Sequence, residues 1–292
     1  MRLVFVHGRG QGGRTAEELL RTWTTALNEG LAAIDRPALG PRTEVRLPFY
    51  GRQLEELSRR RPEPGTVGLR GSDPGTADEL EGRFVLEIAD RAGITEKEIA
   101  AEAGQEVVAR DPQNWAWVQA AARALSRQVP WLGQRLLPVL TEDVHAYLTR
   151  AHVTRVVDDL VAEAVGDGPA VVVAHSLGTV VAYRVLSRVI PTVPVPLLVT
   201  LGSPLGIDVV KTRLPTPLGP PPGVAHWLNA ADERDYVALY SRLDRDTFPA
   251  EIENLSDVHN PRDDPHGIAG YLRDRVVAAR IDRALNPPAA AS

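Results

Sequence analysis

The segment from Val171 to Ala182 constrains the fold of this chain more than any other part of the sequence. It reads VVVAHSLGTVVA, a run of β-branched residues followed by a serine turn and then by a helical pattern. The residues two before and two after Ser176 are Ala174 and Gly178. A strand that turns this sharply into a helix brings the two elements so close that only small residues fit at both positions. We therefore expect Ser176 at the carboxyl end of a buried strand.

Short β-branched runs alternate with helical patterns in much of the chain. This alternation is typical of an α/β fold, a mostly parallel central sheet flanked by helices. We expect strands at about Arg2–His7, Thr43–Leu47, Ala170–Ala174, Pro196–Leu201, Val224–Ala230 and Glu251–Leu255. We expect the main helices of this body at about Thr15–Ala33, Thr141–Val165, Leu177–Val189 and Gly267–Leu285.

Residues from about Tyr50 to Thr141 interrupt the alternation. A connection of this length is too long to be a plain loop in a compact domain. It contains helical patterns at about Ala77–Ala92, Glu96–Val108 and Gln113–Arg127. We therefore predict one domain over 1–292, with a helical cap or lid inserted over 50–141.

Composition excludes several classes of protein. A chain of 292 residues, 43% of them hydrophobic, is long enough for one large core. The net charge of -5 argues against electrostatic binding of nucleic acid, and the absence of cysteine excludes disulfides and thiolate chemistry. No stretch approaches the ~20 apolar residues of a membrane span. We expect a cytoplasmic protein without an integral membrane segment, and its oligomeric state stays open.

The turn at Ser176 predicts a chemical role as well as a fold. A serine between a buried strand and a helix is typical of a nucleophile elbow, in which the turn lifts the hydroxyl above the sheet edge. The start of a helix also presents free backbone N–H groups, which favour an oxyanion. The alternative is a chance serine turn in an α/β protein.

The sequence AHSLGTVVAY resembles the elbow of lipases and esterases in the α/β-hydrolase superfamily. The preceding LTEDVHAYL resembles the lead-in to the elbow of DDHD-type intracellular phospholipases. The resemblance covers His7–Gly13, Leu140–Gly206 and Trp227–Leu272, but not the cap. It implies an α/β-hydrolase fold and a Ser-His-Asp triad, and Ala174 departs from it because glycine is commoner there.

The resemblance also implies the groups that would hold an oxyanion. In the superfamily, the turn after the first strand supplies one N–H, which carries over to Arg9 after His7-Gly8. The N–H of Leu177 supplies the other. The glycine-rich loop has a second interpretation, which is nucleotide binding, but GRGQGG does not match G-x-G-x-x-G.

The triad order of the superfamily is serine, acid, histidine along the chain. We favour His266 as general base because it follows the last expected strand, and His259 is the second choice. For the acid we favour Asp235, since Glu-Arg-Asp-Tyr-Val resembles a lipase pattern, and Asp232 is the second choice.

These residues together predict a serine hydrolase that cleaves a small-molecule or lipid-like ester through an acyl-enzyme intermediate, with no cofactor and no metal. Two alternatives stay open. The same triad serves peptidases and amidases, and a hydrolase-like fold can be retained as a non-catalytic binding module.

Overall fold

A computed structural model describes the chain except for residues 9–10, 60–73, 104–111, 113, 129–143 and 288–292. Its contacts divide it into two compact units. The first comprises Met1–Arg52, Arg155–Gly206 and Leu214–Ser292, and the second comprises Gln53–Thr154 and Ile207–Arg213. Each unit is described by itself.

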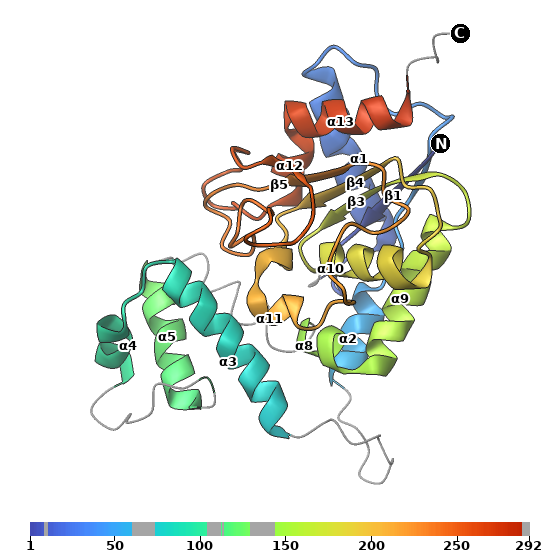
Figure 1. The fold of residues 1–292 in the computed structure, drawn as a ribbon. Coiled ribbons are helices and arrows are strands. Elements are labelled where there is room, and N and C mark those ends of the chain that lie inside the picture. The colour runs from blue at the N-terminus through green and yellow to red at the C-terminus, as the bar shows by residue number, and fades with distance from the viewer. Residues whose placement is uncertain (9–10, 60–73, 104–111, 113, 129–143, 288–292) are drawn as a thin grey trace. The chain divides into compact units, whose positions relative to one another are not determined.

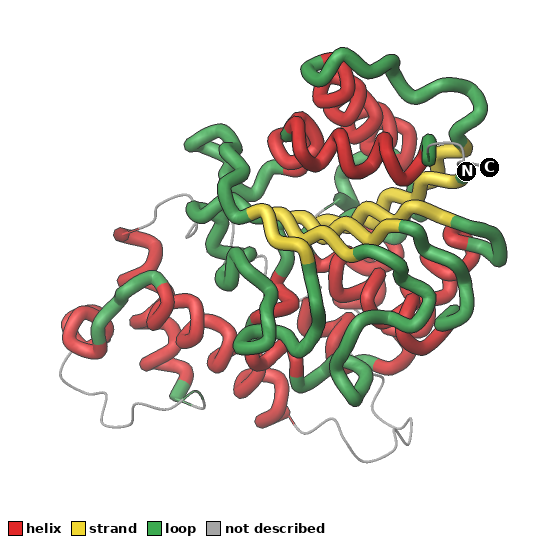
Figure 2. The backbone as a smooth tube through the Cα atoms, turned by 45° about the horizontal axis from the view of Figure 1, so that its top comes forward, coloured by secondary structure: helices red, strands yellow, loops and turns green. Residues whose placement is uncertain are grey.

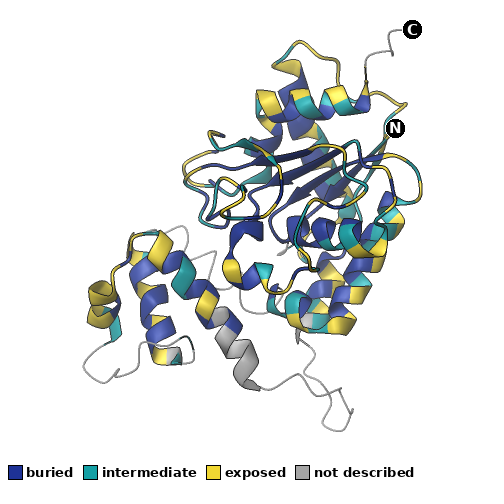
Figure 3. Ribbon diagram, in the orientation of Figure 1, coloured by how far each residue is buried: buried dark blue, intermediate teal, exposed yellow. Residues whose placement is uncertain are grey.

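A single parallel sheet forms the centre of the first unit (Figure 2). Its strands lie in the order β2-β1-β3-β4-β5-β6 and comprise β1 (Arg2–Val6), β2 (Glu44–Arg46), β3 (Ala170–His175), β4 (Leu197–Leu201), β5 (Trp227–Ala230) and β6 (Glu253–Leu255). Every residue of β3, β4 and β5, three of the four interior strands, is buried, as Figure 3 shows in dark blue. Continuous burial is expected where helices cover both faces of a parallel sheet. The prediction of an α/β fold with a parallel, helix-flanked sheet is confirmed.

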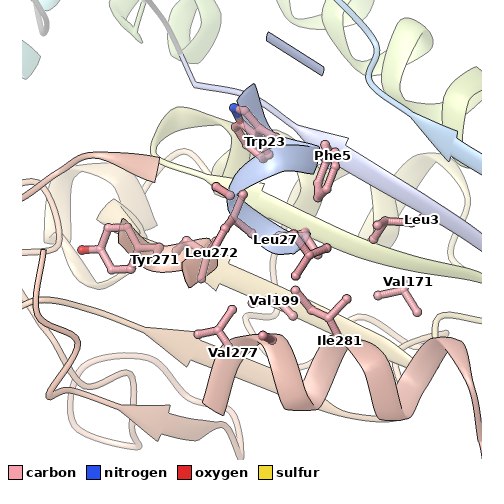
Figure 4. Close-up of a cluster of buried hydrophobic side chains, with 14 of the residues drawn as sticks. Leu3, Phe5, Trp23, Leu27, Val171, Val199, Tyr271, Leu272, Val277 and Ile281 are labelled. Atoms are coloured by element: carbon pink, nitrogen blue, oxygen red, sulfur yellow. The ribbon is translucent and has the colours of Figure 1, made fainter. Parts of the chain in front are cut away.

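Helices cover the two faces of the sheet (Figure 1). On one face lie α1 (Ala16–Ala32), α12 (Ile268–Arg273) and α13 (Arg275–Leu285). On the other lie α10 (Leu177–Arg184), which continues as a π-helical turn over Val185–Val189, and α9 (Ala151–Val165), which joins this unit from Arg155 onward. The first face holds a large apolar cluster in which Phe5 packs against Trp23, with ring centroids 5.1 Å apart (Figure 4).

The second unit consists of helices in the residues that the structure describes. They are α2 (Gly51–Arg59, which starts in the first unit), α3 (Pro74–Arg91), α4 (Glu96–Ala103), α5 (Trp115–Gln128), α8 (His145–Thr149) and α11 (Asp208–Lys211). Helices α3 and α4 both pack on α5 and bury Phe84, Ile99 and Trp117. Parts of two expected helices, residues 104–108 and 113, lie outside the described residues.

Two helices predicted as continuous are broken, and both breaks have a local cause. The helix expected over Thr141–Val165 is interrupted at Arg150, which is extended, and the Thr154 hydroxyl donates to the carbonyl of Tyr147 before the break. Its first three residues, 141–143, lie outside the described part. The helix expected over Gly267–Leu285 is interrupted at Asp274. The Asp274 side chain accepts from the N–H groups of Val276 and Val277 and so starts a new helix.

Gly30 allows α1 to lie close to α12 and α13. A Cβ at this position would lie 2.5 Å from the carbonyl oxygen of Leu272 and 3.0 Å from the Cβ of Ala278. We predict that Gly30→Ala lowers the free energy of unfolding by up to about 2 kcal/mol, because overpacking costs up to ~3 kcal/mol and the gain in helix propensity returns ~1 kcal/mol. Urea denaturation measures this change.

Gly40→Ala is the matched control, because a Cβ there meets no atom within 4 Å. We expect its stability to stay within about 0.5 kcal/mol of the wild type. If Gly30→Ala is as stable as the control, the close approach of the helices does not limit the side chain at position 30.

Candidate functional site

Ser176 lies in the sharp turn between β3 and α10. Its φ is 55° and its ψ is -132°, and Asp35 is the other non-glycine residue with positive φ in the described part of the chain. Such a conformation costs roughly 1–3 kcal/mol and persists where surrounding contacts enforce it. The N–H of Ser176 donates to the carbonyl of Leu201 at 3.0 Å, which fixes the turn against the end of β4.

Two glycines let other main-chain segments approach this turn. A Cβ at Gly8 would lie 2.8 Å from the Cβ of Ser176 and 3.2 Å from its Oγ. A Cβ at Gly178 would lie 2.6 Å from the carbonyl oxygen of His7. The loop after β1 therefore lies directly against the serine side chain, and a larger residue at either glycine would push it away.

His7 and Tyr50 hold the start of that loop. The Nδ1 of His7 lies 2.5 Å from the carbonyl oxygen of Gly8, and its Nε2 accepts from the N–H of Tyr50 at 3.2 Å. The Tyr50 hydroxyl donates to the carbonyl of His7, and the two rings stack with centroids 4.0 Å apart. Burial lowers the pKa of His7 to about 4, so its ring is neutral at pH 7 with the proton on Nδ1.

Of the two residues expected to form the oxyanion hole, the structure describes Leu177 but not Arg9. Leu177 is the first residue of α10, where helix geometry leaves the N–H without an intrahelical acceptor. Arg9 lies outside the described residues, so its proposed part in the oxyanion hole stays a prediction. Its neighbour Gly8 places the chain beside Ser176.

His266 and Asp235 form a hydrogen-bonded pair. The Nδ1 of His266 lies 2.8 Å from Oδ2 of Asp235, and the side chains are 22% and 0% exposed. The other oxygen of Asp235 accepts from the N–H groups of Val237 at 3.0 Å and Ala238 at 3.4 Å. Burial alone would raise the pKa of Asp235, but His266 and the hydrogen bonds together hold it below its ordinary value. The pair leaves the Nε2 of His266 available to a reacting group.

Gly202 connects this pair to Ser176. His175 and Leu201 are register partners on β3 and β4, so Ser176 and Gly202 follow on adjacent strands. A Cβ at Gly202 would lie 2.7 Å from Oδ2 of Asp235 and 3.0 Å from Nδ1 of His266. The His–Asp pair therefore lies over the end of β4, beside the serine turn. The structure records no hydrogen bond between Ser176 and His266, and such bonds often tighten only when substrate is bound.

Asp232, the second candidate acid, has a different set of partners. Its oxygens accept from the main-chain and guanidinium N–H groups of Arg234 and from the N–H of Asn260, at 2.6–3.0 Å. Burial opposes its charge, but these partners lower the pKa of Asp232 below the ordinary value. Asp232 ties the loop after β5 to the loop before His266, and the structure brings Asp235 rather than Asp232 to the imidazole.

The second-choice base, His259, and two residues that are not candidates, His226 and Ser203, have different surroundings. His259 is exposed. His226 is exposed just before β5, at the opposite end of the strands from the serine turn. The Ser203 hydroxyl is buried, shares a hydrogen bond with Thr179 at 2.8 Å and accepts from the N–H of Leu205.

The sequence analysis missed three residues that hold His266. The Nε2 of His175 donates to the carbonyl of His266 at 2.9 Å, and the two ring centroids lie 4.5 Å apart. The Nδ2 of Asn260 donates to the carbonyls of Pro265 and Gly267, on either side of His266. Tyr271 donates to Asp235. The position of His175 next to Ser176 was a usable signal, whereas Asn260 and Tyr271 become visible only in three dimensions.

A cavity of about 470 Å³ in the second unit and one of about 540 Å³ beside α13 lie among the described residues, and neither is lined by Ser176, Asp235 or His266. Within the same residues, no group of three or more His, Asp or Glu is placed to hold a metal ion. No described helix is both long and apolar enough to cross a membrane.

Comparisons of the chain with known protein families, with curated proteins and with solved structures found no significant match.

Proposed function

We propose that this chain is a serine hydrolase of the α/β-hydrolase fold that cleaves a carboxylic ester through an acyl-enzyme intermediate. Ser176 is the nucleophile, His266 the general base and Asp235 the acid that orients it. The observation that carries the proposal is the His266–Asp235 pair at the end of β4, beside a serine held at positive φ at the end of β3. The three residues also follow one another in the order typical of the α/β-hydrolase superfamily.

The first chemical step is attack by Ser176 on the substrate carbonyl. His266 takes the hydroxyl proton on Nε2, because its Nδ1 is bound to Asp235. The buried carboxylate fixes the tautomer and ring orientation and stabilises the imidazolium that forms. His266 then protonates the leaving alcohol, and a water molecule activated by the same histidine releases the acid.

The tetrahedral intermediate needs two hydrogen-bond donors. We assign them to the N–H groups of Leu177 and Arg9, the first at the start of α10 and the second after Gly8, which lies against Ser176. Each such donor contributes roughly 3–4 kcal/mol of transition-state stabilisation in enzymes of this type.

The proposed substrate is a small-molecule or lipid-like ester, on the basis of the resemblance of AHSLGTVVAY to lipases and esterases. We also propose that the second unit, which comprises Gln53–Thr154 and Ile207–Arg213, is the helical cap. Its apolar interior, with Phe84, Ile99 and Trp117 buried, makes it a packed element of structure rather than a plain connection.

The nucleophile is tested with a fluorophosphonate probe and p-nitrophenyl esters of increasing acyl length. We expect the wild type to be labelled and to turn over esters, and Ser176→Ala to lose labelling and roughly 10⁴-fold or more of the turnover. The chain-length optimum reports the size of the acyl pocket.

Ser203→Ala is the matched control, because Ser203 is a buried serine near the same edge whose hydroxyl is engaged with Thr179. It is expected to keep labelling. Labelling that persists in Ser176→Ala would move the nucleophile elsewhere, and a folded wild type that is not labelled would favour a binding module. Faster cleavage of p-nitroanilides than of esters would favour an amidase.

The acid is tested by comparing Asp235→Asn with Asp232→Asn. We expect Asp235→Asn to lower kcat/KM for the ester on the order of 10³–10⁴-fold, because the amide cannot hold His266 in the required tautomer. Asp232→Asn is expected to lower the melting temperature, since it breaks the bonds to Arg234 and Asn260, while activity falls less than tenfold. The opposite ranking of the two activities would assign the triad acid to Asp232.

A further inference from the structure

Tyr271 makes a hydrogen bond that the triad mechanism does not require. It lies on α12 and is fully buried, and its hydroxyl donates to Oδ2 of Asp235 at 2.6 Å. The same oxygen accepts from Nδ1 of His266 at 2.8 Å. Two donors therefore share one carboxylate oxygen, while the N–H groups of Val237 and Ala238 occupy the other.

We propose that Tyr271 is a positioning residue that limits how strongly Asp235 stabilises the protonated His266, and thereby sets the pH above which His266 acts as a base. The inference rests on the proposed function, since it concerns the same triad. The proposed effect depends on one hydrogen bond, which the phenol O–H of Tyr271 donates to Oδ2 of Asp235.

The geometry fixes the direction of the Tyr271 hydrogen bond. The main-chain N–H of Asp232 donates to the Tyr271 oxygen at 3.1 Å, which occupies a lone pair and leaves the phenol proton for Asp235. Burial, followed by the nearby charge of Asp235, raises the pKa of Tyr271 well above its ordinary value. Tyr271 therefore stays a donor at every pH at which the triad works.

A donor on Oδ2 disperses the negative charge that His266 would otherwise receive. Charge-assisted hydrogen bonds to a carboxylate are stronger than neutral ones, and a carboxylate that has several donors is a weaker partner for each of them. When the phenol no longer donates to Oδ2 of Asp235, more negative charge on that oxygen interacts with the Nδ1–H of His266. The imidazolium is then stabilised more strongly, and the base becomes active only at higher pH.

Three other titratable groups lie near His266 or on its loop, and none of them is altered chemically by a substitution at Tyr271. Burial, and then the neighbouring His266, lower the pKa of His175 to about 3, so its ring stays neutral although it lies 4.5 Å from the His266 ring. Asp232 is neutralised by its ion pair with Arg234. Asp264 lies on the same loop, two residues before His266.

The test is the pH dependence of fluorophosphonate labelling in Tyr271→Phe, measured as a second-order rate constant. We expect the midpoint of the acid limb to move to higher pH by up to about one unit, which corresponds to the net worth of one hydrogen bond. Tyr183→Phe is the matched control, because it also removes one buried hydroxyl, bonded to the carbonyl of Gly219 at 3.0 Å. It should leave the midpoint unchanged. An unchanged midpoint in folded Tyr271→Phe would overturn the proposal.

Replacing Tyr271 site-specifically with 3-fluorotyrosine gives a second test with the opposite sign. The ring keeps its shape, but its phenol is more acidic and donates more strongly. We expect the midpoint to move to lower pH. If this variant and Tyr271→Phe shift the midpoint in the same direction, disturbed packing explains both and the proposal is wrong. The fluorinated variant also decides the question if Tyr271→Phe does not fold.

Proton NMR tests the role of Tyr271 independently of the proposed hydrolase function. The Nδ1 proton of His266 is expected to move downfield in Tyr271→Phe and upfield with 3-fluorotyrosine, whether or not the protein hydrolyses anything. If the wild type is not labelled but these shifts occur, the hydrolase proposal fails and the coupling of Tyr271 to the His–Asp pair stands. If labelling is normal and the signal does not move, the coupling fails alone.

Discussion

The carboxylate of Asp235 is buried, and a buried charge is tolerated only where enough donors surround it. Its four hydrogen bonds come from its own loop, from α12 and from the loop that carries His266. Satisfying this one group therefore fixes three segments that are distant in sequence. Tyr271 extends the network, since the N–H of Asp232 donates to its oxygen, and Asp232 in turn holds Asn260. The position of His266 follows from the burial of Asp235.

The serine turn depends on a second constraint, the close spacing of parallel strands. Neighbouring strands lie about 4.8 Å apart, so segments that leave β1, β3 and β4 at the same edge compete for space. Gly8, Gly178 and Gly202 lie where these segments meet, and at each one a Cβ would contact the main chain or side chains of the site. Packing of this kind holds Ser176 at its unfavourable φ. The strain is local, and the paired strands β1, β3 and β4 that oppose it are buried at every residue except Arg2.

The sequence predicted those parts of this structure that depend on local patterns of residues. The β-branched runs predicted the parallel sheet, and the small residues around Ser176 predicted its turn. The breaks at Arg150 and Asp274 were missed, because a hydrogen bond from a side chain to the main chain competes with the helical pattern without changing its apolar spacing. Tyr271 was missed for a different reason. On α12 it has the spacing of an ordinary core residue. The sequence does not reveal that its hydroxyl donates to Asp235, which lies 36 positions earlier.

Three histidines lie close to Ser176, and their surroundings separate their roles. His7 and His175 are buried, which lowers their pKa values to about 4 and about 3, so both stay neutral at pH 7. Each ring also donates a hydrogen bond to a carbonyl, His7 to that of Gly8 and His175 to that of His266. His266 alone of the three faces a carboxylate, which can stabilise a positive charge on the ring. A proton released from Ser176 in the proposed reaction therefore has one favourable acceptor, and the two neutral rings serve to hold the loop and the base in place.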